Sequence, residues 1–350
     1  MGDVQTNMAK DIERIAKIAQ SCFQNHPVIV LGSGASVAHR IRSMDALAQY
    51  LRDNLDVQED EQENDAWTLI RAALANGDGL EEALQQTAAP HSLVRKIVDL
   101  TWEAIASDDL ALLQRAAANQ ESFPLKDFIC GLFKSTNNTI NIVTPNYDRA
   151  AEYATDIAGY IHATGFVPGL IRRREGADTI LVRKGNNPAR TVRIWKVHGS
   201  LDWFEDANEK VISLPLSRQL PDGFLPLIVT PGVSKYERTH EEPFRSVIQG
   251  ADAALGRAAA FFCVGYGFRD THIQPKLVQR CRQKNVPVVV LAKKLTDEAR
   301  QFLTDNGGAA YLAMEDCDEG TRAYTAEMPE GEIIEDKKLW SFEEFNKLVL

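Results

Sequence analysis

Cysteine is scarce in this chain of 350 residues, and none of its cysteines is grouped with another. No Cys-x-x-Cys pair occurs among the five. Structural zinc sites and disulfide frameworks both need cysteines at short spacings. The sequence therefore argues against both, and we expect no metal. The cysteines are Cys22, Cys130, Cys263, Cys281 and Cys317.

Long apolar runs are missing as well. No stretch approaches the roughly 20 apolar residues that cross a bilayer as a helix. Residues 1–10 mix polar and charged side chains, which is not the pattern of a secretory signal peptide. We therefore expect a cytoplasmic protein that does not enter a membrane.

Surplus positive charge is the third absence, because the net charge is −10. Surfaces that bind nucleic acid broadly neutralise phosphates with Lys and Arg, so we expect no strong direct binding of nucleic acid. One local exception is the run Arg172–Arg174, which is followed by further basic residues up to Arg193. We interpret it as the solvated face of a hairpin, with a contact for phosphate or an acidic partner as the alternative.

A glycine-rich turn follows the first predicted strand, Val28–Leu31. Its residues are Gly32, Ser33, Gly34, Ala35 and Ser36, and a helix is expected from near Ser36. Glycines here allow a pyrophosphate to approach the backbone, and a helix N-terminus offers it free N–H groups. Val37 replaces the third glycine of the usual dinucleotide fingerprint. A tight strand-to-helix turn without a ligand is therefore the alternative.

Polar residues follow the ends of two later predicted strands. Thr144, Asn146 and Asp148 come after one strand, and His198 comes after the other. Open α/β sheets place ligands at the carboxyl ends of their strands, so these side chains could share one crevice. Asparagine can hold a water or an amide, and histidine can take a proton near neutral pH. An Asx turn at Asn146 and a core histidine at position 198 are the alternatives.

A second glycine loop, with Gly265 and Gly267, follows a later apolar strand. Its position fits the binding of an adenosine ribose, and a plain turn is the alternative. Asp270 stands where it could bind the same ligand, but we favour its interpretation as the cap of the helix that begins near Thr271 or His272. Trp203 and Phe204 are expected to pack in the core, with a lid over the ligand as the less favoured alternative.

The order of predicted elements indicates an α/β fold with a doubly wound, mostly parallel sheet. Strands alternate with helices after Thr139, whereas residues 45–134 contain only helical patterns and read as an insertion. The acidic stretch Asp316–Asp336 reads as a flexible connector, and Lys338–Leu350 as a short helix. Later strands are expected at Ile194–Val197, Leu227–Thr230, Ala259–Gly265, Pro287–Ala292 and Ala309–Ala313.

Four of these stretches, in the same order, resemble the sirtuin fold family over roughly Val28 to Ala313. They are Gly32–Ser36, Thr144–Asp148, Val197–Ser200 and Val264–Ile273; the last resembles the sirtuin-like branch of bacterial anti-phage systems. The resemblance implies a Rossmann-like NAD-binding domain at 1–44 and 135–315, a helical insertion at 45–134, and an acidic connector with a C-terminal helix at 316–350. The four-cysteine zinc module of the protein-deacylating sirtuins is missing from Leu201–Arg218.

By this resemblance, NAD would be the substrate and no metal would be needed. Asn146 would position water or the ribose, His198 would be the base, and Asp148 would hold the nicotinamide amide or orient its loop. The implied function is an NAD+ glycohydrolase effector of anti-phage defence by abortive infection. A regulatory subunit that senses NAD or ADP-ribose without turnover is the alternative, and a protein deacylase is a weaker one.

An enzyme that freely destroyed NAD would poison its own cell, so its active state must be rare until it is triggered. The sequence shows no sensor domain beyond the NAD-binding fold. We therefore expect control through assembly into a homo-oligomer, through a partner protein, or through both. By resemblance the partner would be a HerA-type ATPase or an Argonaute-like protein, with the ATPase favoured. The product, ADP-ribose or its cyclic form, is left open by the sequence.

Overall fold

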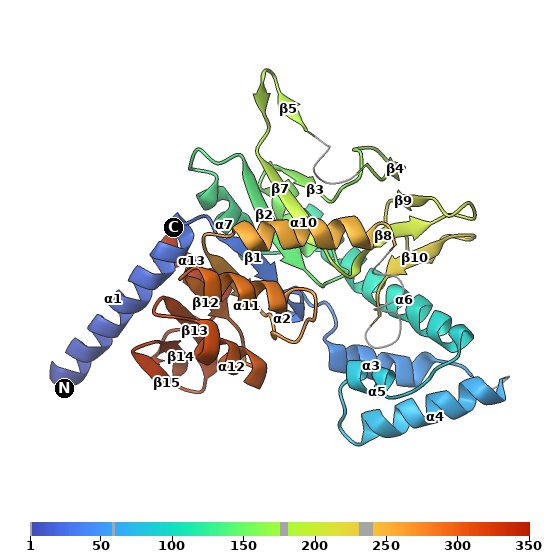
Figure 1. Cartoon of the computed structure of the whole chain (residues 1–350), viewed down its shortest axis with the longest axis horizontal. Coiled ribbons are helices and arrows are strands. Elements are labelled where there is room, and N and C mark those ends of the chain that lie inside the picture. The colour runs from blue at the N-terminus through green and yellow to red at the C-terminus, as the bar shows by residue number, and fades with distance from the viewer. Residues whose placement is uncertain (1, 58–59, 176–180, 231–240) are drawn as a thin grey trace.

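A nine-stranded sheet forms the centre of the protein in a computed structural model that describes residues 2–57, 60–175, 181–230 and 241–350 (Figure 1). The seven neighbouring strands from β13 to β3 are parallel, and β14 and β15 add to one edge in antiparallel fashion. In the order in which they pair, the strands are β15 (Met328–Glu335), β14 (Gly320–Thr325), β13 (Tyr311–Cys317), β12 (Val288–Leu291), β11 (Phe261–Val264), β1 (Val28–Leu31), β2 (Thr139–Thr144), β7 (Thr191–Lys196) and β3 (Ile161–Ala163).

The chain reverses its direction across the sheet between β1 and β11. From β1 it continues to β2 and β7 on one side, and it later crosses back to β11, β12 and β13 on the other. This is the strand order of a doubly wound sheet, which confirms the predicted fold class. Ligands of such sheets bind at the carboxyl ends of the strands beside this switch point.

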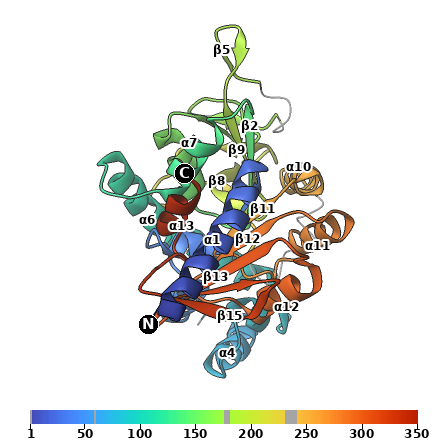
Figure 2. The same ribbon diagram turned by 90° about the vertical axis from the view of Figure 1, so that its left-hand side faces the viewer.

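Helices cover both faces of the sheet. Figure 2 shows α1 and α13 on one side of the strands and α10, α11 and α12 on the other. Ile29 and Leu31 of β1 belong to one apolar core, whereas Val28 and Val30 belong to the other, which is why the whole strand is apolar. The helices of the first face are α1 (Gly2–Gln24), α6 (His91–Ala117), α7 (Pro124–Leu132), α8 (Ala150–Ile157) and α13 (Phe342–Val349); those of the second are α10 (Phe244–Arg257), α11 (Gln274–Gln283) and α12 (Asp297–Asn306).

No helix in the described ranges has both the length and the apolar character needed to cross a membrane.

Residues 45–134 contain helices and no strand wherever the structure describes them. The helices α3 (Met44–Asn54), α4 (Glu61–Ala75) and α5 (Leu80–Gln85) pack on the first half of α6 around a core of their own. Ser43 caps α3, because its side-chain oxygen accepts the N–H of Ala46. The second half of α6, with Trp102 and Leu112, and the whole of α7 pack in the core of the sheet instead. The separate core therefore ends near Ala104, well before residue 134.

The expectation of a flexible connector at Asp316–Asp336 is wrong. These residues complete β13 and form β14 and β15, which pair in antiparallel fashion. Thr321 and Ala323 are buried, whereas all three glutamates of β15 lie exposed on the edge strand. Charged residues on an edge strand commonly prevent it from pairing with another chain. Here they make the amino-acid composition of β15 similar to that of a flexible linker, which is why the strand was not predicted. The helix expected after the connector is present as α13.

A smaller antiparallel sheet packs beside the main one, and the sequence did not reveal it. Its order is β10 (Leu225–Ile228), β8 (Gly199–Glu205), β9 (Val211–Ser213) and β4 (Arg172–Arg173). Trp203 and Phe204 of β8 are buried in the cores, as expected. A separate hairpin of β5 (Arg183–Lys184) and β6 (Asn187–Pro188) projects from the body (Figure 1).

Two of the three arginines at 172–174 are not solvated as expected. Arg172 pairs with the buried Asp202 at 2.8 Å. Arg174 donates to the carbonyl of Thr164 and lies over the ring of Trp203. Burial would raise the pKa of Asp202, but the arginine charges beside it hold that pKa below its usual range. The run therefore anchors the smaller sheet, and only Arg173 keeps an exposed side chain.

The contact between α10 and β7 gives a test of the packing. A Cβ at Gly250 would lie 2.0 Å from the ring of Trp195. We expect Gly250→Ala to lower the free energy of unfolding by about 1–3 kcal/mol, because the added methyl group overpacks the core. Gly256→Ala, on the same helix with open space around it, should instead raise stability by up to about 1 kcal/mol. Urea unfolding would measure both changes, and equal effects would contradict this packing.

Candidate functional site

Four loops meet at one edge of the sheet because they follow four neighbouring parallel strands. These strands are β11, β1, β2 and β7, in that order across the sheet. The first glycine loop follows β1, the Asn146 loop follows β2, His198 follows β7, and the second glycine loop follows β11. The topology therefore brings the carboxyl ends of all four strands, with every predicted site residue, to one edge.

The two glycine loops interlock backbone to backbone. Gly34 donates its N–H to the carbonyl of Gly265 at 3.1 Å. A Cβ at Gly32 would lie 2.3 Å from that carbonyl oxygen, and one at Gly34 would lie 2.8 Å from the Cα of Gly265. Gly265 itself has φ +57°, which favours glycine. Close contact between the loops thus requires all three glycines, whereas a Cβ at Gly267 would make only an ordinary contact with Thr296.

The first loop runs directly into a short helix, α2 (Ser33–Val37), which begins earlier than the sequence suggested. Ser33 and Gly34 are exposed, Ala35 is half-buried and Ser36 is buried. The early part of the turn therefore faces outward, whereas its end faces the loop that follows β2.

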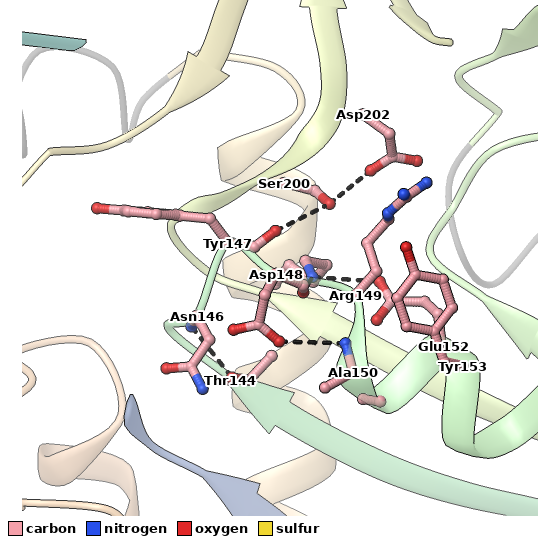
Figure 3. A network of polar contacts seen from close by, with 12 residues as sticks. Thr144, Asn146, Tyr147, Asp148, Arg149, Ala150, Glu152, Tyr153, Ser200 and Asp202 are labelled. Carbon is pink, nitrogen blue, oxygen red and sulfur yellow. Dashed lines mark hydrogen bonds and ion pairs between the residues drawn. The ribbon is translucent and has the colours of Figure 1, made fainter. Parts of the chain in front are cut away.

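Asn146 and Asp148 lie on the turn after β2 (Figure 3), and their side chains join this turn to the first glycine loop. Asn146 Nδ2 donates to the carbonyl of Gly32 and to Ser36 Oγ, both at 2.8 Å, across more than 100 residues of chain. Ser36 Oγ in turn donates to Asp148 Oδ2 at 2.6 Å. Asn146 therefore does more than form a local turn.

The start and end of this loop are also fixed. Thr144 Oγ1 donates to the carbonyl of Leu31 at 2.9 Å and accepts the N–H of Asn146 at 3.1 Å. Asp148 Oδ1 accepts the N–H of Ala150 at 3.1 Å, at the beginning of α8. Figure 3 shows the contact of Thr144 with Asn146 and that of Asp148 with Ala150, on either side of the turn. Thr144 thus binds the loop to β1, and Asp148 binds it to the helix behind.

His198 and Asp270 form a pair that the sequence did not predict. His198 Nε2 lies 2.9 Å from Asp270 Oδ2, and the two side chains are 9% and 7% exposed. Asp270 Oδ1 accepts the N–H groups of His272 and Ile273, both at 2.9 Å, so the favoured interpretation as a cap holds. Asp270 therefore uses both oxygens within the protein. The one feature of the sequence that could have indicated this pair is the position of Asp270 just after the second glycine loop.

The charge state of Asp270 follows from these contacts. Burial would raise the pKa of this carboxyl, but His198 and the two main-chain N–H donors hold the pKa well below its usual range. Asp270 is therefore ionised at neutral pH. A carboxylate facing Nε2 favours the histidine tautomer with its proton on that nitrogen, which leaves Nδ1 as the proton acceptor.

The Asn146 and His198 clusters are connected through main-chain groups. The hydroxyl of Tyr147 donates to the carbonyl of Val229 at 2.5 Å, and the N–H of Val229 donates to the carbonyl of His198 at 2.9 Å. Tyr147 also accepts the N–H of Leu201 at 3.1 Å through its own carbonyl. Tyr147 thus holds Leu201, three residues after His198, and Val229, which binds the carbonyl of His198.

A cavity of about 390 Å³ lies at the opposite edge of the sheet and is not this site. Among its lining residues, Val28 begins β1 and Asn137 precedes β2, which places it at the amino ends of the strands.

The pairing of Asp270 with His198 predicts a pH-dependent contribution to stability. Because folding lowers the pKa of Asp270, its contribution is fully present above the unfolded pKa of about 3.9 and is lost as pH falls through the folded value. We expect Asp270→Asn to lower the free energy of unfolding at pH 7 by about 1–3 kcal/mol, since the buried contact between the carboxylate and His198 is lost.

Urea unfolding between about pH 2 and 7 measures this effect, because the window brackets the unfolded pKa. Asp60→Asn is the control, since Asp60 also caps a helix through two N–H groups, those of Gln62 and Glu63. Asparagine keeps both caps, so only Asp270→Asn should flatten the acid limb of the stability curve. Equal profiles for the two variants would show that Asp270 acts as a cap alone.

Comparisons with solved structures find distant similarity to Sir2 proteins. The chain is similar to a Sir2 homologue in complex with NAD, at 13% identity over 86% of this chain and 87% of that chain, with a TM-score of 0.41. It is also similar to a structure that concerns the mechanism and regulation of Sir2 enzymes, at 13% identity over 81% and 88%, with a TM-score of 0.40. At these values the fold assignment rests on the strand order itself. No curated protein matches the chain significantly.

A family model described as the SIR2-like domain matches residues 140–307. That range contains Asn146, His198 and Asp270, while the first glycine loop precedes it. The segment that supplies these three side chains is therefore the part of the chain that is similar to the SIR2-like domain.

Proposed function

We propose that this protein is an NAD+ glycohydrolase that cleaves NAD+ to nicotinamide and ADP-ribose. The observation that carries the proposal is His198, held by the ionised Asp270 at the same sheet edge as Asn146 and the two glycine loops. The similarity of residues 140–307 to the SIR2-like domain supports the choice of NAD as the substrate.

The glycine loops would bind the dinucleotide. Ser33 and Gly34 are exposed, so a pyrophosphate would approach the turn there, while the N–H of Gly34 itself is bound to Gly265. Gly265 and Gly267 lie on the other side of the switch point, where the adenosine ribose would bind. Gly34 must be a glycine because of its contact with Gly265, so contacts within the protein already fix the conformation of the loop without a ligand.

The bond to nicotinamide would break through a cation-like ribosyl state, as in glycoside cleavage. The leaving group is neutral, so no strong acid is needed. His198 would accept a proton from a ribose hydroxyl or from the attacking water through Nδ1, while Asp270 holds the other nitrogen. Asn146 would position that water or the ribose, and Asp148 would hold the nicotinamide amide while keeping the loop in place.

A sensor of NAD or ADP-ribose without turnover would need the glycine loops alone. The oriented pair of His198 and Asp270 favours the enzyme, because binding requires no general base. Deacylation of proteins is disfavoured, because residues 201–218 contain no cysteine where the deacylating sirtuins carry a four-cysteine zinc module.

Activity of this kind would serve anti-phage defence by abortive infection. NAD loss kills the host cell, so the resting enzyme must be held inactive. Moving a two-state enzyme from about 1% to 99% active requires roughly 5.5 kcal/mol of differential binding. A protein interface can supply this energy, and we propose a homo-oligomer that a HerA-type ATPase activates.

Substitutions at the two central side chains test the chemistry. His198→Ala should reduce NAD+ cleavage by about 10²–10⁴-fold, the usual contribution of a general base. Asn146→Ala should also abolish most cleavage, because it frees the water or ribose and releases Gly32 and Ser36. Nicotinamide release under activating conditions, measured by chromatography, follows both.

Matched controls lie elsewhere on the same sheet. His162→Ala removes a histidine that pairs with Asp156 at 2.6 Å, and Asn141→Ala removes an amide that accepts from Trp195 at 3.1 Å. Both should keep near-normal turnover. Normal turnover in His198→Ala and Asn146→Ala would refute the assignment, whereas unfolding of these two variants alone would favour purely structural roles.

Control by assembly has its own test. We expect the isolated chain to form a higher-order homo-oligomer with weak NAD+ cleavage, and to become strongly active with its partner and a phage-derived signal. Light scattering recorded alongside nicotinamide release measures both properties. Full activity in a dilute monomer would contradict control by assembly.

A further inference from the structure

Lys196 is a fully buried charge beside the candidate site. It is the last residue of β7 and precedes His198 by two positions, and its side chain is 0% exposed. Its Nζ donates to the main-chain carbonyl of Asp148 and lies 3.2 Å from Glu152 Oε1 on α8. The ammonium group therefore joins the strand that leads to His198 to the end of the Asn146 loop.

A buried pair of this kind is a poor source of stability. The cost of desolvating two charges can outweigh their attraction, and apolar residues of similar size at the same positions often give a protein that is equally stable or more stable. Glu152 Oε2 has no hydrogen-bond partner among the described residues, so the pair is incompletely satisfied. Burial also raises the pKa of Glu152, despite the charge of Lys196 nearby. Stability alone does not explain why a lysine stands here.

The contacts of Lys196 suggest what it does instead. Neutral main-chain bonds already hold the first part of the loop, from Val197 to the carbonyl of Thr144 at 3.0 Å and from Leu201 to that of Tyr147 at 3.1 Å. Lys196 holds the next carbonyl along, that of Asp148. The Asp148 carboxylate then accepts from Ser36, which accepts from Asn146.

The turn is therefore bound at the carbonyls of Thr144, Tyr147 and Asp148, and Lys196 supplies the charged bond at the last of them. Figure 3 shows Asn146, Asp148 and Glu152 following one another from the end of β2 into α8. Loss of the Lys196 bond would free the carbonyl of Asp148. The Asp148 carboxylate would then hold Ser36 less firmly, and Ser36 would hold the amide of Asn146 less firmly. The position of Asn146 relative to His198 would then be fixed less tightly.

We propose that Lys196 is a positioning residue, which fixes the turn at 145–149 so that Asn146 stays in place relative to His198. It acts through the main chain and does not touch the substrate. The proposal deepens the proposed NAD+ glycohydrolase function and rests on it for its effect on rate.

The test removes both charges together, because loss of one would leave the other buried without a partner. Lys196→Met/Glu152→Leu keeps similar volumes and withdraws the bond to Asp148. We expect kcat to fall by about 10²-fold with little change in KM, since small misplacements of a reacting group have effects of that size. Glu152→Gln, which leaves Lys196 and its bond in place, should keep most of the activity.

Lys96→Met/Glu63→Leu is the matched control. That pair also joins a lysine to a buried glutamate, at 2.6 Å, but it lies in the helical insertion between α4 and α6. It should leave kcat unchanged. An equal loss of kcat in both double variants would overturn the proposal, because the effect would then follow from general loosening of the protein.

Hydrogen exchange at the amides of residues 146–150 gives a readout that does not depend on activity. Exchange should accelerate in Lys196→Met/Glu152→Leu and stay unchanged in the control and in Glu152→Gln. Unchanged exchange in the first variant would overturn the positioning role. Faster exchange, together with a wild-type protein that never releases nicotinamide even when activated, would support the positioning role and refute the proposed function.

If the double variant does not fold, Lys196→Gln/Glu152→Gln takes its place. It keeps polar groups at both positions, but glutamine is shorter than lysine and withdraws its donor from Asp148. The same faster exchange and lower kcat are expected, and unchanged values of both would overturn the proposal.

Discussion

The contact between the two glycine loops is the constraint on which the rest of the site depends. The chain reverses across the sheet between β1 and β11, so the loops that follow these strands must meet. Gly32, Gly34 and Gly265 let them meet backbone to backbone, with no room for a Cβ at any of the three. This brings the carbonyl of Gly32 within reach of Asn146, and the continuing second loop carries Asp270 to His198.

The polar side chains of the site are held by the protein itself. Asn146 is bound to Gly32 and Ser36, and both oxygens of Asp270 are engaged. Groups that are oriented in advance can act on a reacting bond without the cost of reorganising them. The buried charges of Lys196 and Glu152 fit the same account, because they add little stability but fix the turn that carries Asn146.

Much of the fold could be predicted because local sequence patterns determine which segments form strands and which form helices. The apolar run of β1 indicates a strand that is covered on both faces, and the patterns of residues 45–134 indicate helices alone. The acidic edge strand β15 was hidden because its exposed glutamates read as a linker. The pairing of β8 with β10 and of His198 with Asp270 depends on contacts between distant segments, which no local pattern encodes.

The central claim is that residues at this sheet edge break the bond between nicotinamide and ribose. The most direct measurement is a proton NMR time course of NAD+ with the assembled protein, which follows the nicotinamide ring and the adjoining ribose together. The account predicts free nicotinamide and a ribose product that appear at equal rates, in ADP-ribose or in its cyclic form. Bound NAD+ that stays intact throughout, with the protein fully assembled and activated, would contradict it.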